Sequence, residues 1–331
     1  FLIIFLVSFP EILIIAIPET PGPVDKAKIV IKNIIALNIN KLYIFYMIIW
    51  LASYPKSGNT WVRAIISSLI YSDDGIFKLN LLKKIDQFPE KKYFKEYVKD
   101  FSNFDLIKQN WILAQDKVNL DNNIKIFKTH QGKYTVNNDD FTNNENTKAT
   151  IYIVRDPRNV VTSISNHFTK SIDESLKFMM SNSIIGDKKS FNESVKDKNS
   201  RMLTLLGKWN DHYRSWTRKK DNFLLIKYED LLLNPKLEIE KISIFLKNYL
   251  KFDLNKEKID NIVKTTSFEN LKKLEDEETF SEGVLNKEKN SKVNFFYMGP
   301  KNKWEEILSK QILKSIESTF YKEMQEIGYL N

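Results

Sequence analysis

Residues 54–61 combine the side-chain types that bind a phosphate group. The segment reads Tyr-Pro-Lys-Ser-Gly-Asn-Thr-Trp and lies between an apolar run over 48–54 and a helical pattern over 60–71. A loop between a strand and a helix directs backbone amides towards a ligand above the strand's carboxyl end. The lysine adds a positive charge, three polar side chains add hydrogen-bond donors, and the glycine allows the backbone to approach closely. The residues of this predicted phosphate loop are Lys56, Ser57, Gly58, Asn59 and Thr60.

The loop is not a Walker loop, because Gly-Lys-Ser/Thr occurs nowhere in the chain. Taken alone, it is equally compatible with an ordinary strand-to-helix turn that carries a surface lysine. A second strand, turn and helix start over residues 151–163 favours ligand binding. Arg155 follows that strand with a planar set of donors suited to phosphate, Pro157 opens the helix, and Ser163 lies about two helical turns later on the same side.

The chain contains three histidines. His130 ends a short strand pattern at 126–130, at the carboxyl edge where the sites of α/β proteins form. A histidine that titrates near neutrality can remove a proton from a hydroxyl group. A single histidine is more often structural, and we interpret His167 and His212 in that way.

The positions of these residues depend on alternating strands and helices. Strands are predicted over 48–54, 124–128, 150–154 and 223–227, and helices over 60–71, 235–250 and 306–327, with a further helix opened by Pro157. The last helix carries Ile312, Ile316, Phe320 and Met324 on one face. Residues 272–294 are charged and poor in apolar groups, which predicts a mobile loop or lid. The alternation predicts an α/β fold with a doubly wound parallel sheet flanked by helices.

With these motifs, the chain from about Ile48 to Tyr329 resembles the PAPS-dependent sulfotransferases, particularly the cytosolic type and its bacterial relatives (PAPS is 3′-phosphoadenosine 5′-phosphosulfate). The resemblance implies a single domain with the P-loop-like sulfotransferase fold and PAPS as co-substrate, without a metal. It implies that the phosphate loop holds the 5′ end of PAPS and that Trp61 packs on the adenine. Arg155 and Ser163 correspond to the residues that bind the 3′-phosphate, a group that ATP lacks.

The resemblance also implies a mechanism for in-line transfer of a sulfuryl group to an acceptor hydroxyl. Lys128-Thr129-His130 resembles the family's Lys-Thr-His segment, in which the histidine is the general base. Lys56 would neutralise the leaving phosphate, and Lys128 would contact the transferred sulfuryl oxygens.

Three further segments resemble donor-binding parts of the family. Tyr228 corresponds to a tyrosine that contacts the nucleotide, and it could instead be a buried structural residue. Thr266-Ser267-Phe268 resembles the segment whose ring covers the other adenine face, although Phe268 could be plain core. The family's C-terminal signature, Arg-Lys-Gly followed by Gly-Asp-Trp, is incomplete here. Gly299 and Trp304 keep their spacing, but both basic residues before Gly299 are missing, and Lys301 is the candidate replacement.

Composition limits the other possibilities. The 331 residues include 42% hydrophobic side chains, enough for a sizeable core, and no cysteine, which excludes disulfides, thiolate metal sites and cysteine nucleophiles. The net charge of +9 reflects either a solvated lysine-rich surface or an anionic ligand. We find no metal-binding motif and no clustered basic patch with interleaved aromatics, so nucleic-acid binding is not expected. The alternatives are a kinase-like or a non-catalytic nucleotide-binding protein.

Residues 1–46 differ from the rest of the chain. Pro10 and Glu11 interrupt the apolar stretch Phe1–Ile17, and residues 18–23 read Pro-Glu-Thr-Pro-Gly-Pro. We expect a non-native or poorly ordered extension before a domain at 47–331, with a membrane anchor as the alternative. We predict a cytoplasmic protein without stable membrane association. The acceptor is expected to be a small molecule or a carbohydrate with a hydroxyl group, contacted by segments 72–123, 131–148 and 169–200. The sequence does not identify that acceptor or indicate an oligomeric state.

Overall fold

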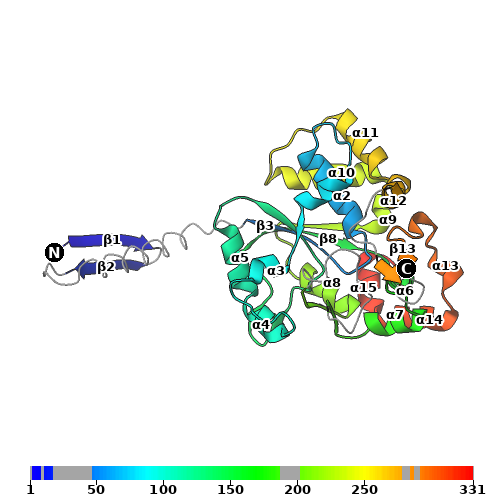
Figure 1. Ribbon diagram of the computed structural model, residues 1–331, viewed down its shortest axis with the longest axis horizontal. Coiled ribbons are helices and arrows are strands. Elements are labelled where there is room, and N and C mark those ends of the chain that lie inside the picture. The colour runs from blue at the N-terminus through cyan, green and yellow to red at the C-terminus, as the bar shows by residue number, and fades with distance from the viewer. Residues whose placement is uncertain are drawn as a thin grey trace.

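The apolar run after Met47 forms strand β3 (Ile48–Ser53), in which every residue is buried. A strand buried on both faces belongs inside a sheet that helices cover on either side. Accordingly, β3 pairs in parallel with β5 (Lys125–Thr129) and with β8 (Thr147–Val154). The structure, a computed structural model, describes residues 2–8, 11–17, 47–186, 202–277, 284–286 and 291–330 (Figure 1).

Within these described residues, five parallel strands form the main sheet in the order β11-β8-β3-β5-β4. β11 (Phe223–Lys227) forms one edge and β4 (Asp86–Gln87) forms the other. The four predicted strands are confirmed, although β8 begins earlier than predicted, and β4 was not predicted. Because the strands are parallel, their carboxyl ends meet at one edge of the sheet.

The two faces of the sheet pack against separate hydrophobic cores. Along β3, Ile48, Trp50 and Ala52 belong to one core, and Ile49 and Leu51 belong to the other. This alternation follows from the two-residue period of a strand. Helices cover both cores, so the predicted doubly wound architecture is confirmed (Figure 1).

Helices from the two halves of the chain cover each face. The Ile49 face packs against α2 (Asn59–Tyr71), η1 (Leu79–Lys84), α9 (Tyr228–Leu233), α10 (Pro235–Lys247), α11 (Lys256–Thr265) and α12 (Phe268–Glu277). The Trp50 face packs against α3 (Lys91–Phe94), α4 (Phe104–Gln109), α5 (Trp111–Asn119), α6 (Pro157–Phe168), α7 (Ile172–Met179), α8 (Trp209–Thr217), α14 (Lys310–Thr319) and α15 (Tyr321–Ile327). In Figure 1, α2 and α10 lie above the sheet, and α8 lies below it.

Two predictions near the C-terminus need correction. The helix expected over 306–327 is divided at Phe320 into α14 and α15, and α13 (Trp304–Ile307) precedes them. The loop expected over 272–294 is partly regular, because α12 continues to Glu277, and β12 (Val284–Asn286) pairs antiparallel with β13 (Ser291–Val293). Its remaining residues, 278–283 and 287–290, lie outside the described residues. Buried Leu271 and Glu275, one helical turn apart, explain why a charged sequence continues the helix.

The remaining described elements are short. β6 (Thr135–Val136) pairs with β7 (Asp139–Asp140), β9 (Ser183–Ile185) pairs with β10 (Thr204–Gly207), and η2 (Gly299–Lys301) precedes α13. In the expected extension, β1 (Leu2–Ser8) and β2 (Glu11–Ile17) form an antiparallel pair, and residues 18–46 lie outside the described residues. No helix in the described part of the chain has the length and apolar character that a membrane crossing requires.

Candidate active site

A cavity of about 350 Å³ lies at the carboxyl ends of β3, β5 and β8. This edge of a doubly wound sheet is where such folds bind ligands. The following site residues predicted from the sequence line the cavity: Lys56, Gly58, Asn59, Thr60, Trp61, Lys128, His130, Arg155, Ser163, Tyr228, Phe268 and Gly299. The fold therefore assembles both predicted phosphate-binding segments and the candidate base around one space.

Two left-handed residues shape the phosphate loop between β3 and α2. Lys56 has a φ of 66° and Gly58 has a φ of 101°. Left-handed residues in a turn curve the backbone amides into a concave surface suited to anions. A Cβ atom at Gly58 would lie 2.7 Å from a ring carbon of Tyr228, so the position requires glycine for space as well as for conformation.

The polar side chains of the loop divide between structural and binding positions. The Asn59 amide group donates to the Leu51 carbonyl and to Ser53 Oγ, both at 3.1 Å, so Asn59 ties the loop to β3. Ser57 is 1% exposed, and its hydroxyl has no hydrogen-bond partner among the described residues. A buried polar atom of this kind is costly unless a ligand or water satisfies it. Ser57 Oγ therefore fits a phosphate-binding role.

Arg155, at the end of β8, lies against the phosphate loop. Its Nη1 donates to the Lys56 carbonyl at 3.2 Å, and its guanidinium lies 4.1 Å from the centroid of the Tyr228 ring. Arg155 is buried, and its Nε has no hydrogen-bond partner within the described part of the chain. The guanidinium thus keeps donor capacity for an anion. Ser163, on α6, lines the same cavity.

Aromatic rings from distant segments border the cavity. The rings of Trp61 and Tyr228 meet edge to face, with centroids 5.5 Å apart. Phe268 approaches Gly299 so closely that a Cβ there would lie 2.3 Å from its ring, and Gly299 has a φ of 51°. Gly299 is therefore needed for close packing beside Phe268. These rings provide the flat, polarizable surfaces on which a purine base stacks.

His130 follows β5, and its imidazole orientation is fixed by hydrogen bonding. Its Nδ1 lies 2.8 Å from the Ser53 carbonyl oxygen and 3.3 Å from Ser53 Oγ. Since a carbonyl oxygen only accepts, Nδ1 carries the proton in the neutral ring. Nε2 is then the nitrogen with a lone pair, as a general base requires.

His212, which the sequence predicts to be structural, forms a hydrogen bond with the backbone of His130. Its Nε2 lies 3.1 Å from the His130 carbonyl oxygen and its Nδ1 lies 2.9 Å from the Tyr152 hydroxyl. Nε2–H therefore donates to the carbonyl, and the hydroxyl donates to Nδ1. His212 is fully buried, and this burial lowers its pKa to about 4.

The pKa of His212 predicts a loss of stability in acid. Between pH 6.5 and about 4, the unfolded chain binds a proton at this residue and the folded chain does not, so the free energy of unfolding falls as pH falls. At 1.36 kcal/mol per pKa unit, the loss across this window is about 3 kcal/mol. Measured by urea unfolding, the free energy of unfolding should be about 2 kcal/mol lower at pH 5 than at pH 7 because of His212. His212→Gln should abolish this contribution to the difference. An equal pH dependence in both proteins would contradict the assignment.

Two lysines, Lys56 and Lys128, line the cavity, and the buried carboxylate of Glu275 binds a segment beside it. Lys128 is 6% exposed, and the Lys56 ammonium lies 3.7 Å from the centroid of the Phe295 ring. Glu275, buried on α12, accepts hydrogen bonds from the backbone amides of Phe295 and Phe296 at 2.6 and 2.8 Å. The chain after β13 is thereby held against the phosphate loop. Within the described residues, no group of three His, Asp or Glu side chains could hold a metal ion.

Four predicted donor-binding residues do not line the cavity: Ser57, whose buried hydroxyl is described above, and Thr266, Ser267 and Lys301. The Thr266 hydroxyl donates to the Ile262 carbonyl at 2.7 Å, and the Ser267 hydroxyl accepts from the Asn270 amide at 3.3 Å, so both serve helix ends. Lys301 is exposed, and the cavity lining contains its buried neighbour Asn302 instead.

Asn302 was not predicted from the sequence. It accepts from the Thr162 hydroxyl at 2.7 Å and donates to the Asn159 carbonyl at 3.0 Å, which joins the C-terminal segment to α6. Trp304 packs its ring 4.1 Å from the Arg158 guanidinium. The other cavity residues that the sequence did not predict include His167, Thr204, Phe295 and Phe296. Only His167 gave a sequence signal, and we had interpreted it as structural.

The chain was compared with known protein families and with individual proteins. Residues 48–328 match the sulfotransferase domain family. The chain belongs to the sulfotransferase family. Among curated relatives, this sulfotransferase is 27% identical to the amine sulfotransferase of Oryctolagus cuniculus, an alignment that covers 84% of this chain and 81% of the relative. It is 23% identical to cytosolic sulfotransferase 5 of Arabidopsis thaliana over 84% and 79% of the two chains.

Solved structures show the same fold. The mouse sulfotransferase SULT7A1, solved in complex with PAP, is 20% identical to this sulfotransferase and aligns over 85% of each chain with a TM-score of 0.50. A retinol dehydratase, solved with retinol and PAP, is 16% identical and aligns over 84% and 81% with a TM-score of 0.51. The predicted family, fold and enzyme class are confirmed, and the roles of individual residues remain predictions.

Proposed function

We propose that this sulfotransferase transfers a sulfuryl group from PAPS to a hydroxyl group of a small-molecule or carbohydrate acceptor. The observation that carries the proposal is the shared cavity, which the phosphate loop, Arg155 and the Lys128–His130 segment all line. The buried Ser57 hydroxyl and Arg155 Nε, which have no hydrogen-bond partner among the described residues, fit a doubly phosphorylated ligand.

In this proposal, the loop residues Lys56, Ser57, Gly58 and Thr60 hold the 5′ end of the donor. Arg155 and Ser163 bind the 3′-phosphate, at the end of β8 and on α6. The adenine stacks on Trp61 and Phe268, with Tyr228 and Gly299 beside it. Asn59 contributes through the position of the loop, because its amide group is engaged with β3.

The reaction then needs a base and positive charge. PAPS, when bound, supplies the sulfuryl group, and its bisphosphate part departs with an added negative charge on a phosphate oxygen. His130 Nε2 accepts the proton of the acceptor hydroxyl, while Nδ1–H holds the ring through the Ser53 carbonyl. The Lys56 ammonium stabilises the charge on the leaving phosphate, and Lys128 faces the sulfuryl oxygens. The loop and β5 hold these groups in position before the acceptor arrives.

Two of the predicted acceptor segments reach the cavity. Gln87 and Glu90 come from segment 72–123, and Ile185 and Gly186 come from segment 169–200, of which residues 187–200 lie outside the described residues. Phe168 and Met202 add apolar surface beside them. We therefore propose an acceptor with an apolar body and a polar end. We also propose that the protein is cytoplasmic.

Ligand selectivity tests the donor assignment. Adenosine 3′,5′-bisphosphate (PAP) should raise the melting temperature, because a ligand that binds only the folded state stabilises it by mass action. AMP lacks the 3′-phosphate that Arg155 and Ser163 are proposed to bind, so its effect at equal concentration should be much smaller. Differential scanning fluorimetry with both nucleotides measures this difference. Equal shifts would refute the 3′-phosphate site.

A further inference from the structure

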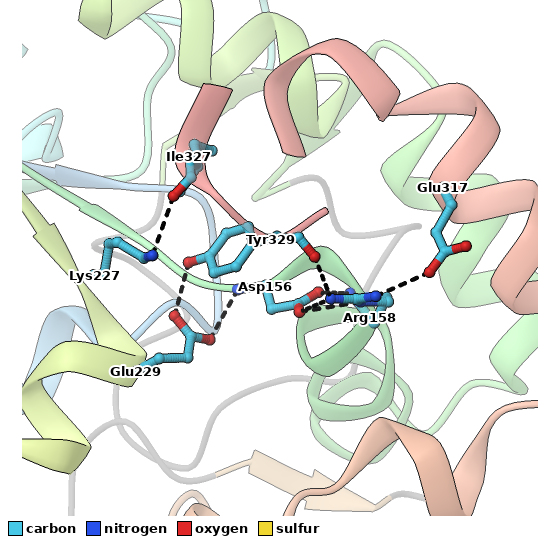
Figure 2. Close-up of polar contacts among 7 residues, drawn as sticks. All are labelled: Asp156, Arg158, Lys227, Glu229, Glu317, Ile327 and Tyr329. Carbon is cyan, nitrogen blue, oxygen red and sulfur yellow. Dashed lines mark hydrogen bonds and ion pairs between the residues drawn. The ribbon is translucent and has the colours of Figure 1, made fainter. Parts of the chain in front are cut away.

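The C-terminal segment after α15 contacts residues that follow β8 and β11, two neighbouring strands of the sheet (Figure 2). The chain turns at Gly328, and the Tyr329 backbone amide donates to the Met324 carbonyl at 2.7 Å. Tyr329 then lies between the residues that follow β8 and those that follow β11. Figure 2 shows its hydroxyl directed towards Glu229 and its carbonyl directed towards Arg158.

The Tyr329 hydroxyl donates a hydrogen bond to the half-buried carboxylate of Glu229. It donates to Glu229 Oε2 at 2.7 Å, and Glu229 Oε1 accepts from the Asp156 backbone amide at 3.0 Å. Burial raises the pKa of the Glu229 carboxyl and raises that of the Tyr329 phenol well above its usual value. The phenol thus stays protonated and keeps its donor. The Glu229 carboxylate therefore links the turn after β8 to the start of α9, and the Tyr329 hydroxyl holds its second oxygen.

The Tyr329 carbonyl anchors a second group at the same place. It accepts from Arg158 Nη2 at 2.9 Å. Arg158 also binds the Asp156 carboxylate through Nε and Nη2, at 3.0 and 2.6 Å, and its Nη1 lies 2.9 Å from Glu317 Oε1 on α14. The C-terminal segment is thus tied to the first turn of α6, the helix that carries Ser163.

The residues held in this way are the immediate neighbours of the proposed donor-binding residues. Asp156 follows Arg155, and Glu229 follows Tyr228. Arg155 and Tyr228 lie against each other at 4.1 Å, and Tyr228 also fills the space beside Gly58. A shift of either strand end would change the place of the Arg155 guanidinium.

We propose that Tyr329 is a positioning residue for the 3′-phosphate subsite: it fixes Asp156 through Glu229 and Arg158, and thereby fixes Arg155. This inference rests on the proposed function, because it assumes that Arg155 binds the 3′-phosphate. Tyr329 itself does not line the cavity.

Tyr329→Phe removes the hydroxyl alone and leaves Glu229 without that donor. We expect the affinity for PAP to fall about tenfold by titration calorimetry, and the affinity for AMP to change less than about threefold. The selectivity is the decisive readout, because a residue that only stabilises the fold would affect both nucleotides alike. Tyr321→Phe, at a tyrosine on α15 that is 53% exposed, is the matched control and should bind both as the wild type does.

A second variant keeps the test valid if Tyr329→Phe does not fold. Lys227 Nζ donates to the Ile327 carbonyl at 3.1 Å and lies 4.9 Å from the Tyr329 ring centroid. Lys227→Met frees the same segment from β11 and should weaken PAP binding selectively, by a smaller factor.

Different results of this experiment would contradict the 3′-phosphate site and the positioning role of Tyr329. Equal losses for PAP and AMP, or no loss in folded variants, would overturn the role of Tyr329 while wild-type selectivity supports the 3′-phosphate site. A wild-type protein that binds both nucleotides equally would refute the proposed donor site, and this inference with it.

Discussion

His130→Ala should lower turnover at least about 100-fold and leave the affinity for PAP nearly unchanged. General-base assistance typically contributes about 10²–10⁴-fold. The substitution removes the nitrogen that we propose as the acceptor of the hydroxyl proton, but it leaves the phosphate loop and Arg155 in place. The imidazole Nδ1 contacts Ser53 of β3, which is not one of the proposed donor-binding residues.

The measurement is turnover per folded molecule, together with PAP affinity by calorimetry. A histidine that only ends a strand would, when removed, reduce stability and leave the remaining folded protein fully active. Wild-type turnover in a folded His130→Ala protein would exclude the general-base role. Recovery of turnover on addition of free imidazole would support it, because the small base can enter the space left by the side chain.

Lys56→Ala should reduce both turnover and donor affinity, which separates it from His130→Ala. The loss of one preorganised group that stabilises developing negative charge typically costs about 10²–10³-fold in turnover. The ammonium would also contact the phosphate before reaction, and a charge-assisted hydrogen bond contributes about 1.5–3 kcal/mol. We therefore expect PAP affinity to fall at least about tenfold.

Lys78→Ala is the matched control, because Lys78 is an exposed lysine that does not line the cavity. Steady-state kinetics and calorimetry on both variants provide the comparison. If Lys56→Ala reduced turnover but left PAP affinity unchanged, the predicted contact between the Lys56 ammonium and the bound phosphate would be contradicted. Unchanged values for both quantities would remove Lys56 from the mechanism.

Local patterns were sufficient to predict four of the five strands described in the main sheet and most of the cavity. Each phosphate-binding segment is a continuous strand, turn and helix start, so its position at the carboxyl edge follows from neighbouring residues. The strand before His130 is buried in the same way, and parallel pairing brings it beside β3. The fold class follows from the same alternation of strands and helices.

The contacts that support the site could not be predicted, because their partners lie far apart in the chain. His212 and His130 are separated by 82 residues, and Tyr329 and Arg158 by 171. No periodic pattern connects such pairs. For the same reason, the sequence suggested Lys301 as the replacement for the missing basic residues. The structure instead buries the adjacent Asn302, which binds Thr162 of α6.

The error at residues 272–294 has a related cause. Charged residues dominate that segment, and its composition is typical of a solvated loop. One of those charges, Glu275, is buried because it accepts two backbone amides from the chain after β13. The carboxylate therefore stabilises α12 and the edge of the cavity, although its charge suggested exposure.

Transfer of labelled sulfate from [³⁵S]PAPS to a panel of phenols, alcohols and sugars tests the central claim most directly. Labelled acceptor and released PAP should be formed in equal amounts, and His130→Ala protein should form at least about 100-fold less of both. Release of PAP without labelled acceptor from any member of the panel would contradict the proposed transfer, as would full transfer by the His130→Ala protein.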